Sequence, residues 1–177
     1  HIKPGLTATL LAEIERGHLD AAITSRPHQM PATLSFRELA IEPMQLIASI
    51  KELEDDPITL MKTRPFIRFD RTAVVGALID NWILSNRIQV SETMELDSPE
   101  AIASMVHANL GVSIVPDLAV KPEDGVQVKR LSLGSDAPSR VLGLAYRNDQ
   151  VKTQAIDAVF AALSQVIEEA GNQHPRA

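Results

Sequence analysis

The sequence predicts an α/β fold, in which strands and helices alternate along the chain. Two observations favour this class: short apolar runs alternate with segments of helical periodicity, and the joins between them are short. A third is the stretch 98–116, which contains a capped helix, a helix stop and a buried strand in succession. We expect mainly parallel strands with helices on both faces, which is typical of this alternation.

The stretch 98–116 reads SPEAIASMVHANLGVSIVP. Ser98 is a good N-cap and Pro99 suits the first helical position. Asn109 tolerates the left-handed conformation that ends a helix, and the apolar run after it reads as a buried strand ending at Pro116. The stretch therefore places a helix N-terminus and two backbone turns around one small space, which suits holding a small ligand.

The other elements follow from the spacing of apolar residues and from turn residues at their ends. The long C-terminal helix has the clearest stripe, with apolar side chains recurring at helical spacing. Helices are expected at 7–16, 74–84 and 153–169, and strands at 19–24, 44–49, 66–69, 88–92, 126–131 and 141–146.

Composition excludes several classes of function. Aromatic residues make up 3% of the chain, which argues against a stacking platform for single-stranded nucleic acid. A formal net charge of −6 argues against binding of a DNA backbone by this stretch. The 177 residues contain no cysteine, so disulfides and thiolate metal sites are excluded, which is compatible with the cytoplasm. No apolar run approaches the ~20 residues of a membrane span.

No constellation for catalysis or metal binding is present. The histidines His1, His18, His28, His107 and His174 show no metal-ligand spacing. The chain contains no G-x-S-x-G elbow, no G-x-G-x-x-G turn and no phosphate-binding P-loop. We therefore expect neither an enzyme nor a bound cofactor or metal.

Four motifs occur in one order across nearly the whole chain. They are GHLDAAIT (17–24), ELAIEPMQLIAS (38–49), RPFIRF (64–69) and the helix stop, turn and strand of 106–116. In this order the chain resembles the effector-binding domain of LysR-type transcriptional regulators.

The resemblance implies a fold like type 2 periplasmic binding proteins, with two α/β lobes joined by two crossovers. Lobe I would comprise 1–60 with 134–177, and lobe II 61–133. The crossovers would lie near 58–64 and 131–139. Ligands of such folds sit in the cleft between the lobes, at the carboxyl ends of strands.

Two departures from the family pattern are visible. Asn109 stands where the family often has glycine, and its tolerance of the left-handed conformation makes this change mild. The family domain also opens with a further strand and helix ahead of His1, and its winged helix-turn-helix is absent. The chain is therefore expected to be an effector domain truncated at its N-terminus.

Seven residues are predicted to contact a ligand. Thr24, Ser25 and Ser49 end strands, so their hydroxyls would face the cleft; the alternative is a role as ordinary turn residues. Arg68 sits in an otherwise apolar strand and could pair bidentately with a carboxylate, or lie over the sheet edge as a surface arginine.

The remaining three predicted contacts belong to the stretch 98–116 and the residue before it. Ser98 is expected as an N-cap whose neighbouring N–H groups could also bind an anion, although Asp97 would repel one. Pro116 would line an apolar wall of the site, unless it is only part of the core.

The leading hypothesis is a small-molecule sensor, plausibly of a carboxylate, whose ligand alters DNA binding by the full-length regulator. DNA would be contacted only through the absent N-terminal domain, and the family implies a homodimer in the cytoplasm without membrane contact. The alternative is a solute-binding protein of a transporter, which uses the same fold. An enzyme on this fold is disfavoured because no acid–base constellation is visible.

Overall fold

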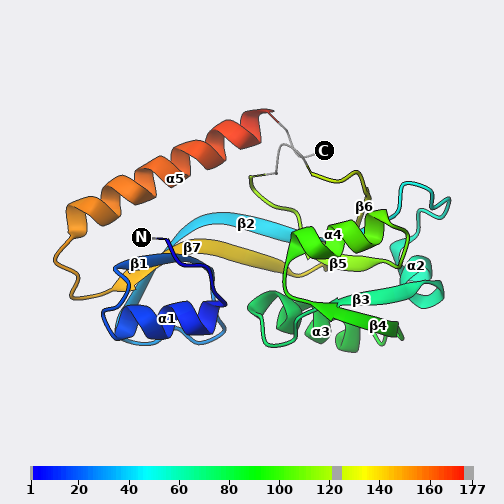
Figure 1. The fold of residues 1–177 in the computed structure, drawn as a ribbon, viewed down its shortest axis with the longest axis horizontal. Helices are drawn as coiled ribbons and strands as arrows, with labels where there is room; N and C mark the ends of the chain where they lie inside the picture. Colours follow the sequence, from blue (N-terminus) through cyan, green and yellow to red (C-terminus); the bar gives the residue numbers. More distant parts are fainter. Residues whose placement is uncertain (1, 121–124, 174–177) are drawn as a thin grey trace. The chain divides into compact units, whose positions relative to one another are not determined.

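The computed structural model describes residues 2–120 and 125–173, and its elements are shown in Figure 1. His1 and His174 lie outside the described residues. The chain divides into two compact units. Unit 1 comprises 1–42, 118–121 and 141–177, and unit 2 comprises 43–117 and 122–140.

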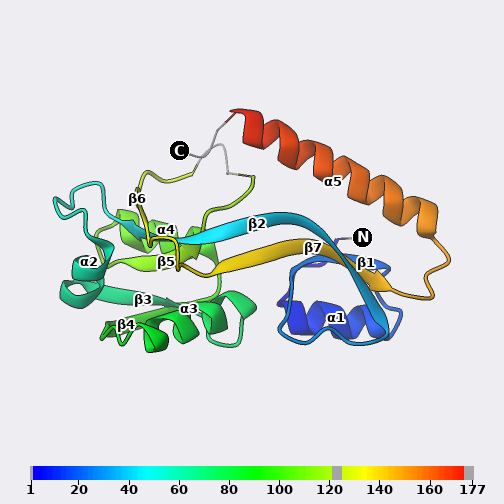
Figure 2. The same ribbon diagram turned by 180° about the vertical axis from the view of Figure 1, so that it is seen from behind.

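Unit 1 is built on antiparallel strands. β1 (Ala21–Ser25) pairs with β7 (Ser139–Arg147), with Ala21 opposite Tyr146 and Ser25 opposite Leu142. β7 in turn neighbours β2 (Leu34–Ala48). Figures 1 and 2 show α1 (Thr7–Glu15) on one side of these strands and α5 (Thr153–Gln173) on the other. Unit 1 is therefore a sheet with one helix on each face.

Each helix of unit 1 is attached to the sheet by different chemistry. α1 contributes Leu11 and Ile14 to a small apolar cluster with Leu34, Ala145 and neighbouring side chains. α5 is held by Arg37 of β2, whose guanidinium lies 3.8 Å from the centre of the Phe160 ring and pairs with Asp157. Ile156 is the buried apolar residue of this helix.

Unit 2 contains a parallel pair of strands, β3 (Pro65–Phe69) and β4 (Ser91–Leu96). A parallel bridge joins Phe66 to Val112, just ahead of β5 (Ser113–Pro116), so β3 lies between β4 and this segment. Gly111 permits the close approach, because a Cβ there would lie 2.4 Å from the carbonyl oxygen of Pro65.

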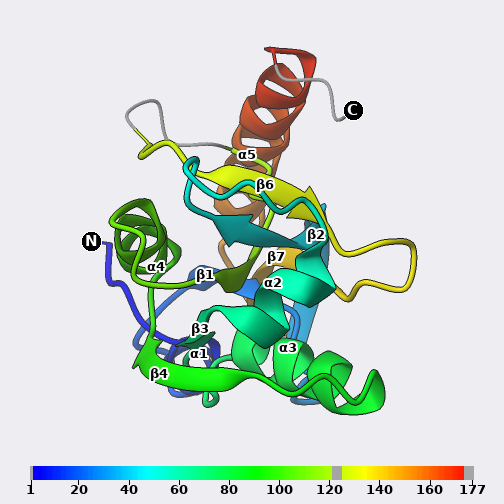
Figure 3. The same cartoon turned by 90° about the vertical axis from the view of Figure 1, so that its right-hand side faces the viewer.

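Three helices surround these strands, as Figure 3 shows end on: α2 (Pro57–Thr63), α3 (Val74–Ser85) and α4 (Pro99–His107). α3 and α4 both pack against β3 and β5. Together the elements enclose the larger apolar core of the chain. Its largest fully buried members are Leu46, Ile47, Leu60, Met61, Phe66, Ile67, Ile79, Ile102 and Ile114.

The boundary between the units falls within β2 and not at 60/61. β2 is a continuous strand of 15 residues. Its first part belongs to unit 1, while residues 44–48 pair antiparallel with β5 and with β6 (Lys129–Ser132). The expected strand at 44–49 is thus the last part of a longer one, because β2 also neighbours β7 and the mixed sequence of its first part gave no apolar run to predict it. The second boundary similarly falls at 140/141, within β7.

Two further differences from the predicted elements concern strand direction and a helix. β1 pairs antiparallel with β7, and β2 pairs antiparallel with both β5 and β6, whereas β3 and β4 are parallel. The expected crossover near 58–64 is instead α2, whose first turn is capped by Asp56 accepting a hydrogen bond from Thr59 N at 2.8 Å. Asn109 has the predicted left-handed conformation, with φ of 60°. Among the described residues, no helix has the length and apolar character to cross a membrane.

Candidate functional site

The carboxyl ends of β3, β4 and β5 lie at one edge of the parallel strands of unit 2, because parallel strands all end on the same side. Asp70 follows β3 and its N–H donates to Leu96 O of β4 at 2.8 Å, which ties the two ends together. Asp97 follows β4, and Pro116 ends β5. Ligands of open α/β sheets bind outside such an edge, so it is a candidate site.

The predicted residues at this edge differ in how available they are. Ser98 Oγ accepts a hydrogen bond from Ala101 N at 3.0 Å and is therefore the N-cap of α4, as expected from the sequence. Asp97 is exposed, and Pro116 is buried opposite Met44 of β2. The edge thus offers a capped helix terminus beside an exposed carboxylate.

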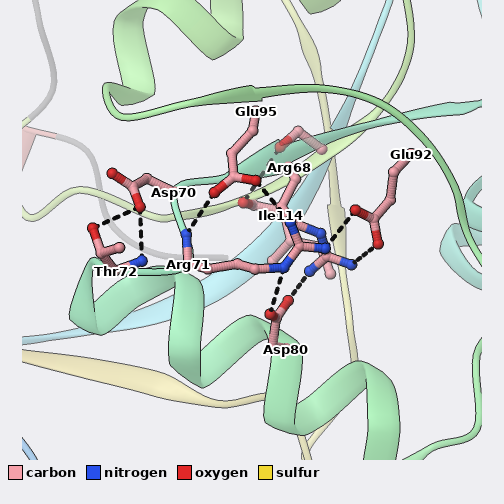
Figure 4. Close-up of polar contacts among 9 residues, drawn as sticks. Arg68, Asp70, Arg71, Thr72, Asp80, Glu92, Glu95 and Ile114 are labelled. Carbon is pink, nitrogen blue, oxygen red and sulfur yellow. Dashed lines mark hydrogen bonds and ion pairs between the residues drawn. The ribbon is translucent and has the colours of Figure 1, made fainter.

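Arg68 is occupied by carboxylates of the protein. Its side chain is buried, with 5% of the residue exposed, and its guanidinium pairs with Asp80 of α3 and with Glu92 of β4, the latter at 2.5 Å (Figure 4). The carboxylate partner that a ligand was expected to supply is therefore provided by the fold. Its position at alternating spacing in β3 did not reveal this, because the two acids come from distant segments.

Arg71 extends this group of charges toward the surface, as Figure 4 shows. It donates from Nη2 to Glu92 at 2.5 Å and from Nη1 to Glu95 at 2.7 Å, and its Nε lies 3.4 Å from Asp80. Hydrogen bonds from Arg68 are the main cause that lowers the pKa of the Glu92 carboxyl from 4.5 to about 2, with Arg71 adding to the effect. The five side chains therefore form one ionic network joining β3, β4 and α3.

The lowered pKa of Glu92 predicts a loss of stability in acid. Because the carboxyl binds a proton more weakly in the folded chain than in the unfolded one, its stabilisation is complete above about pH 4.5 and is lost as the pH falls toward 2. Urea unfolding at pH 6 and pH 3 should show that the free-energy gap between wild type and Glu92→Gln shrinks at the lower pH. Glu168→Gln, on the exposed surface of α5, controls for the loss of one carboxylate elsewhere. A gap that stays constant between the two pH values would contradict the prediction.

Ser49 lies at the opposite edge of unit 2. β2 runs antiparallel to β5, with Met44 opposite Pro116 and Ile47 opposite Ser113, so Ser49 is beyond the amino end of β5. Ser49 is five positions after Met44, about 17 Å along an extended chain. Ser49 Oγ is buried and accepts from Lys51 N at 3.3 Å. The structure therefore does not bring Ser49 together with Pro116.

Thr24 and Ser25 end β1 in unit 1, and both are buried. Thr24 is 4% exposed, and its hydroxyl has no hydrogen-bond partner among the described residues. Buried polar atoms are nearly always paired, so an unpaired hydroxyl at a strand end marks a place where a ligand or water could bind. Sequence reasoning had selected Thr24 from its position alone.

The N-terminus of α1 lies at the same end of β1, as Figure 1 shows. A tight turn through Gly17, with φ of 75°, joins the helix to the strand and reverses the chain direction. Ala22 packs on the cluster that contains Leu11 and Ile14. Thr24 faces the same way about 6.6 Å further along the strand, which brings it one helical turn closer to the start of α1.

This helix terminus has no side-chain cap. Leu6 occupies the N-cap position and makes no capping hydrogen bond, so the first N–H groups of α1 have no side-chain acceptor from it. Such groups favour an anion, because the N–H donors and the helix dipole act together. Sequence reasoning missed this terminus, although leucine where Ser, Thr, Asp or Asn usually stands was a visible signal.

The charged side chains nearest in sequence to Thr24 and to the start of α1 are Arg26 and Lys3, respectively. Arg26 pairs with Glu38 of β2 and lies 5.5 Å from the centre of the Phe36 ring, and Lys3 pairs with Glu13 at 3.1 Å. The donors that unit 1 presents here are therefore neutral N–H and O–H groups. In the part of the chain that the structure describes, no cluster of three or more His, Asp or Glu side chains could hold a metal ion.

The chain belongs to the LysR substrate binding domain family, whose profile matches residues 1–168. It is thus a LysR-type effector-binding domain, from a family of regulator domains and not of enzymes, and the family predicted from the sequence is confirmed. The family also favours the regulator over the transporter alternative.

Relatives and solved structures agree with this assignment. The hydrogen peroxide-inducible genes activator of Haemophilus influenzae is 25% identical over 89% of this chain and 54% of that protein. The SoxR regulator of an Arthrobacter strain is 22% identical over 94% of this chain and 56% of that protein. The chain therefore spans about half the length of these curated relatives.

Among solved structures, full-length OxyR C199D from Pseudomonas aeruginosa covers all of this chain, and the match extends over 60% of the OxyR chain at 21% identity and a TM-score of 0.77. The effector-binding domain of QuiR in complex with shikimate covers 96% of this chain and 80% of its own, at 20% identity and a TM-score of 0.72. These likenesses confirm the predicted type 2 periplasmic-binding-protein-like fold.

Proposed function

We propose that the chain binds a small molecule bearing a carboxylate, and that this binding alters how the full-length regulator contacts DNA. The carboxylate would be held in unit 1 by the first N–H groups of α1 and by the hydroxyl of Thr24, with Ser25 beside it. Dimerisation of the full-length protein remains a prediction from the family.

The observation that carries this proposal is the unpaired hydroxyl of Thr24. A buried hydroxyl without a partner costs about 1–3 kcal/mol, and a ligand oxygen would remove that cost. Its place near the uncapped start of α1 adds donors suited to the same oxygen atoms. Two independent features of unit 1, the Thr24 hydroxyl and the start of α1, thus both favour a carboxylate as the ligand group.

A carboxylate ligand is also supported by a protein of the same fold and by the residue types of this chain. QuiR, which shares the fold, was solved with shikimate, and shikimate is a carboxylate. A thiol-based response is not available to these residues, because the sequence contains no cysteine. Neutral donors can hold a singly charged carboxylate without an arginine, so the pairing of Arg68 with Asp80 and Glu92 does not weaken the proposal.

Of the other predicted ligand contacts, three are kept in the proposal and two are left out. Asp97, Ser98 and Pro116 remain predicted contacts, supported by their place at the carboxyl edge of the strands of unit 2. Ser49 and Arg68 are left out of it, because Ser49 lies at the other edge and Arg68 already has two carboxylate partners.

The proposal predicts opposite effects of Thr24→Val on binding and stability. Valine keeps the shape of threonine and removes the hydroxyl, so the melting temperature without ligand should stay unchanged or rise. Affinity for a bound carboxylate should fall about tenfold, because a hydrogen bond to a charged group contributes about 1.5 kcal/mol. Thermal shift and titration calorimetry with shikimate, benzoate and the uncharged benzamide measure both effects.

Thr33→Val is the matched control, since the exposed hydroxyl of Thr33 donates to Glu15 at 2.7 Å elsewhere in unit 1. Its carboxylate affinity should equal that of the wild type. Equal thermal shifts with benzoate and benzamide, or no shift with any carboxylate, would contradict the carboxylate class. Unchanged affinity in Thr24→Val would contradict the site.

A further inference from the structure

Glu42 is a buried carboxylate that the proposed site does not use. The residue is 1% exposed and stands in β2 immediately before the boundary between the units at 42/43. Among its contacts, Glu42 Oε1 accepts a hydrogen bond from the backbone N–H of Ala119 at 2.6 Å. A short bond to a charged acceptor is among the stronger hydrogen bonds in proteins.

The bond to Ala119 continues the pairing of β2 with β5 beyond the end of β5. Met44 opposes Pro116 in the last register position, and Asp117 N then donates to Pro43 O at 2.8 Å. Two residues further on, Ala119 N donates to the side chain of Glu42 instead of to a backbone carbonyl. The side chain of Glu42 therefore adds one hydrogen bond between β2 and the stretch that follows the end of β5.

Proline makes one of the two passages between the units stiffer than the other. Pro43 fixes its own φ and restricts Glu42 to extended backbone, so β2 is stiff where it passes from one unit to the other. The stretch after β5 passes between units at 117/118 and has no such restraint in its own sequence, Asp117-Leu118-Ala119. It is fastened to β2 by the two bonds just described, one on each side of the boundary, and by a longer bond from Gln45 Nε2 of β2 to Asp117 Oδ1 at 3.4 Å.

We propose that Glu42 is a positioning residue that fastens the stretch after β5 to β2, so that the passages of the chain at 42/43 and 117/118 are held together. The carboxylate does this as a hydrogen-bond acceptor placed at a fixed reach from a stiff strand. Without it the N–H of Ala119 loses its acceptor and the stretch around it opens independently of β2.

Amide hydrogen exchange of the whole chain, resolved at Ala119 by NMR, tests the proposal in three variants. Glu42→Ala removes the acceptor, and exchange at Ala119 should rise at least tenfold. Glu42→Gln keeps an acceptor oxygen at the same reach, so protection should be largely restored. Glu42→Asp keeps the charge but shortens the side chain by one methylene, so protection should be lost as in the alanine variant.

Glu38→Ala is the control, because Glu38 is an exposed carboxylate on the same strand and pairs with Arg26. In the Glu38→Ala variant, the rate of amide hydrogen exchange at Ala119 should equal that of the wild type. Unchanged exchange in Glu42→Ala, or a rise of the same size at core amides throughout the chain, would overturn the proposal. If the alanine variant does not fold, the contrast between Gln and Asp decides: equal protection in both would overturn it as well.

Discussion

Replacing Arg68 with alanine should lower the free energy of unfolding by about 3 kcal/mol, within the range for breaking a buried ion pair. The change removes a buried guanidinium and leaves Asp80 and Glu92 without their main partner. Two features keep the loss below the upper end of that range. Arg71 still lies near both acids, and Glu92 is 39% exposed, so water screens part of the unpaired charge.

Arg71→Ala is the matched control for this prediction. Arg71 pairs with Asp80, Glu92 and Glu95, but its own side chain is 45% exposed, so its loss should be far less costly. Urea unfolding of both variants at neutral pH gives the comparison. Equal losses in the two variants would mean that burial of Arg68 is not what makes the network stabilising.

The same variant separates the two roles considered for Arg68. If Arg68 only stabilises the fold, a folded Arg68→Ala variant should bind benzoate or shikimate with the affinity of the wild type. A loss of carboxylate binding in folded Arg68→Ala, with Thr24→Val unaffected, would return Arg68 to the ligand site and contradict the proposal for unit 1.

Gly76→Ala should destabilise the chain by about 3 kcal/mol, although alanine is normally the better helix former by about 1 kcal/mol. A Cβ at position 76 would lie 1.9 Å from the carbonyl oxygen of Asp70 and 3.0 Å from that of Phe69. Both are backbone atoms at the end of β3, so no side chain can move aside. The start of α3 would have to shift away from β3, which lies beside it in the core.

Gly171→Ala provides the opposite case within the same chain. Gly171 is in α5, and nothing lies within 4 Å of the position that its Cβ would take. Helix propensity alone should act there, so stability should be unchanged or rise by up to about 1 kcal/mol. Thermal unfolding of both variants checks the contrast. A Gly76→Ala variant as stable as Gly171→Ala would contradict the close approach of α3 to β3.

Periodicity and end signals were enough to predict most elements of this chain. The helix after Ser98 begins and ends as predicted, because capping and left-handed stops are local properties of a few neighbouring residues. The strand at 66–69 and the helix at 74–84 were predicted within one residue of their ends. The order of four motifs was enough to assign the family.

The candidate site was predicted less completely, and the reason is the same for each residue. Thr24 was selected because it ends a strand, but the unpaired state of its hydroxyl depends on which atoms surround it. Arg68 was expected to await a ligand because Asp80 and Glu92 are 12 and 24 positions away in sequence and carried no visible link to it. The start of α1 was overlooked because an uncapped helix terminus becomes a candidate ligand site only when it lies near another free donor, here Thr24, and that proximity arises from the tertiary fold.

The sequence by itself determined the α/β class and the local ends of helices, because these depend on side chains within a few positions of one another. It also determined the family, through the order of four such local motifs along the chain. The tertiary structure decided that β2 serves both units, that Ser49 and Pro116 lie at opposite edges, and that Arg68 is neutralised by the fold. These outcomes depend on strand direction, pairing and charge partners drawn from distant segments, which no local pattern encodes.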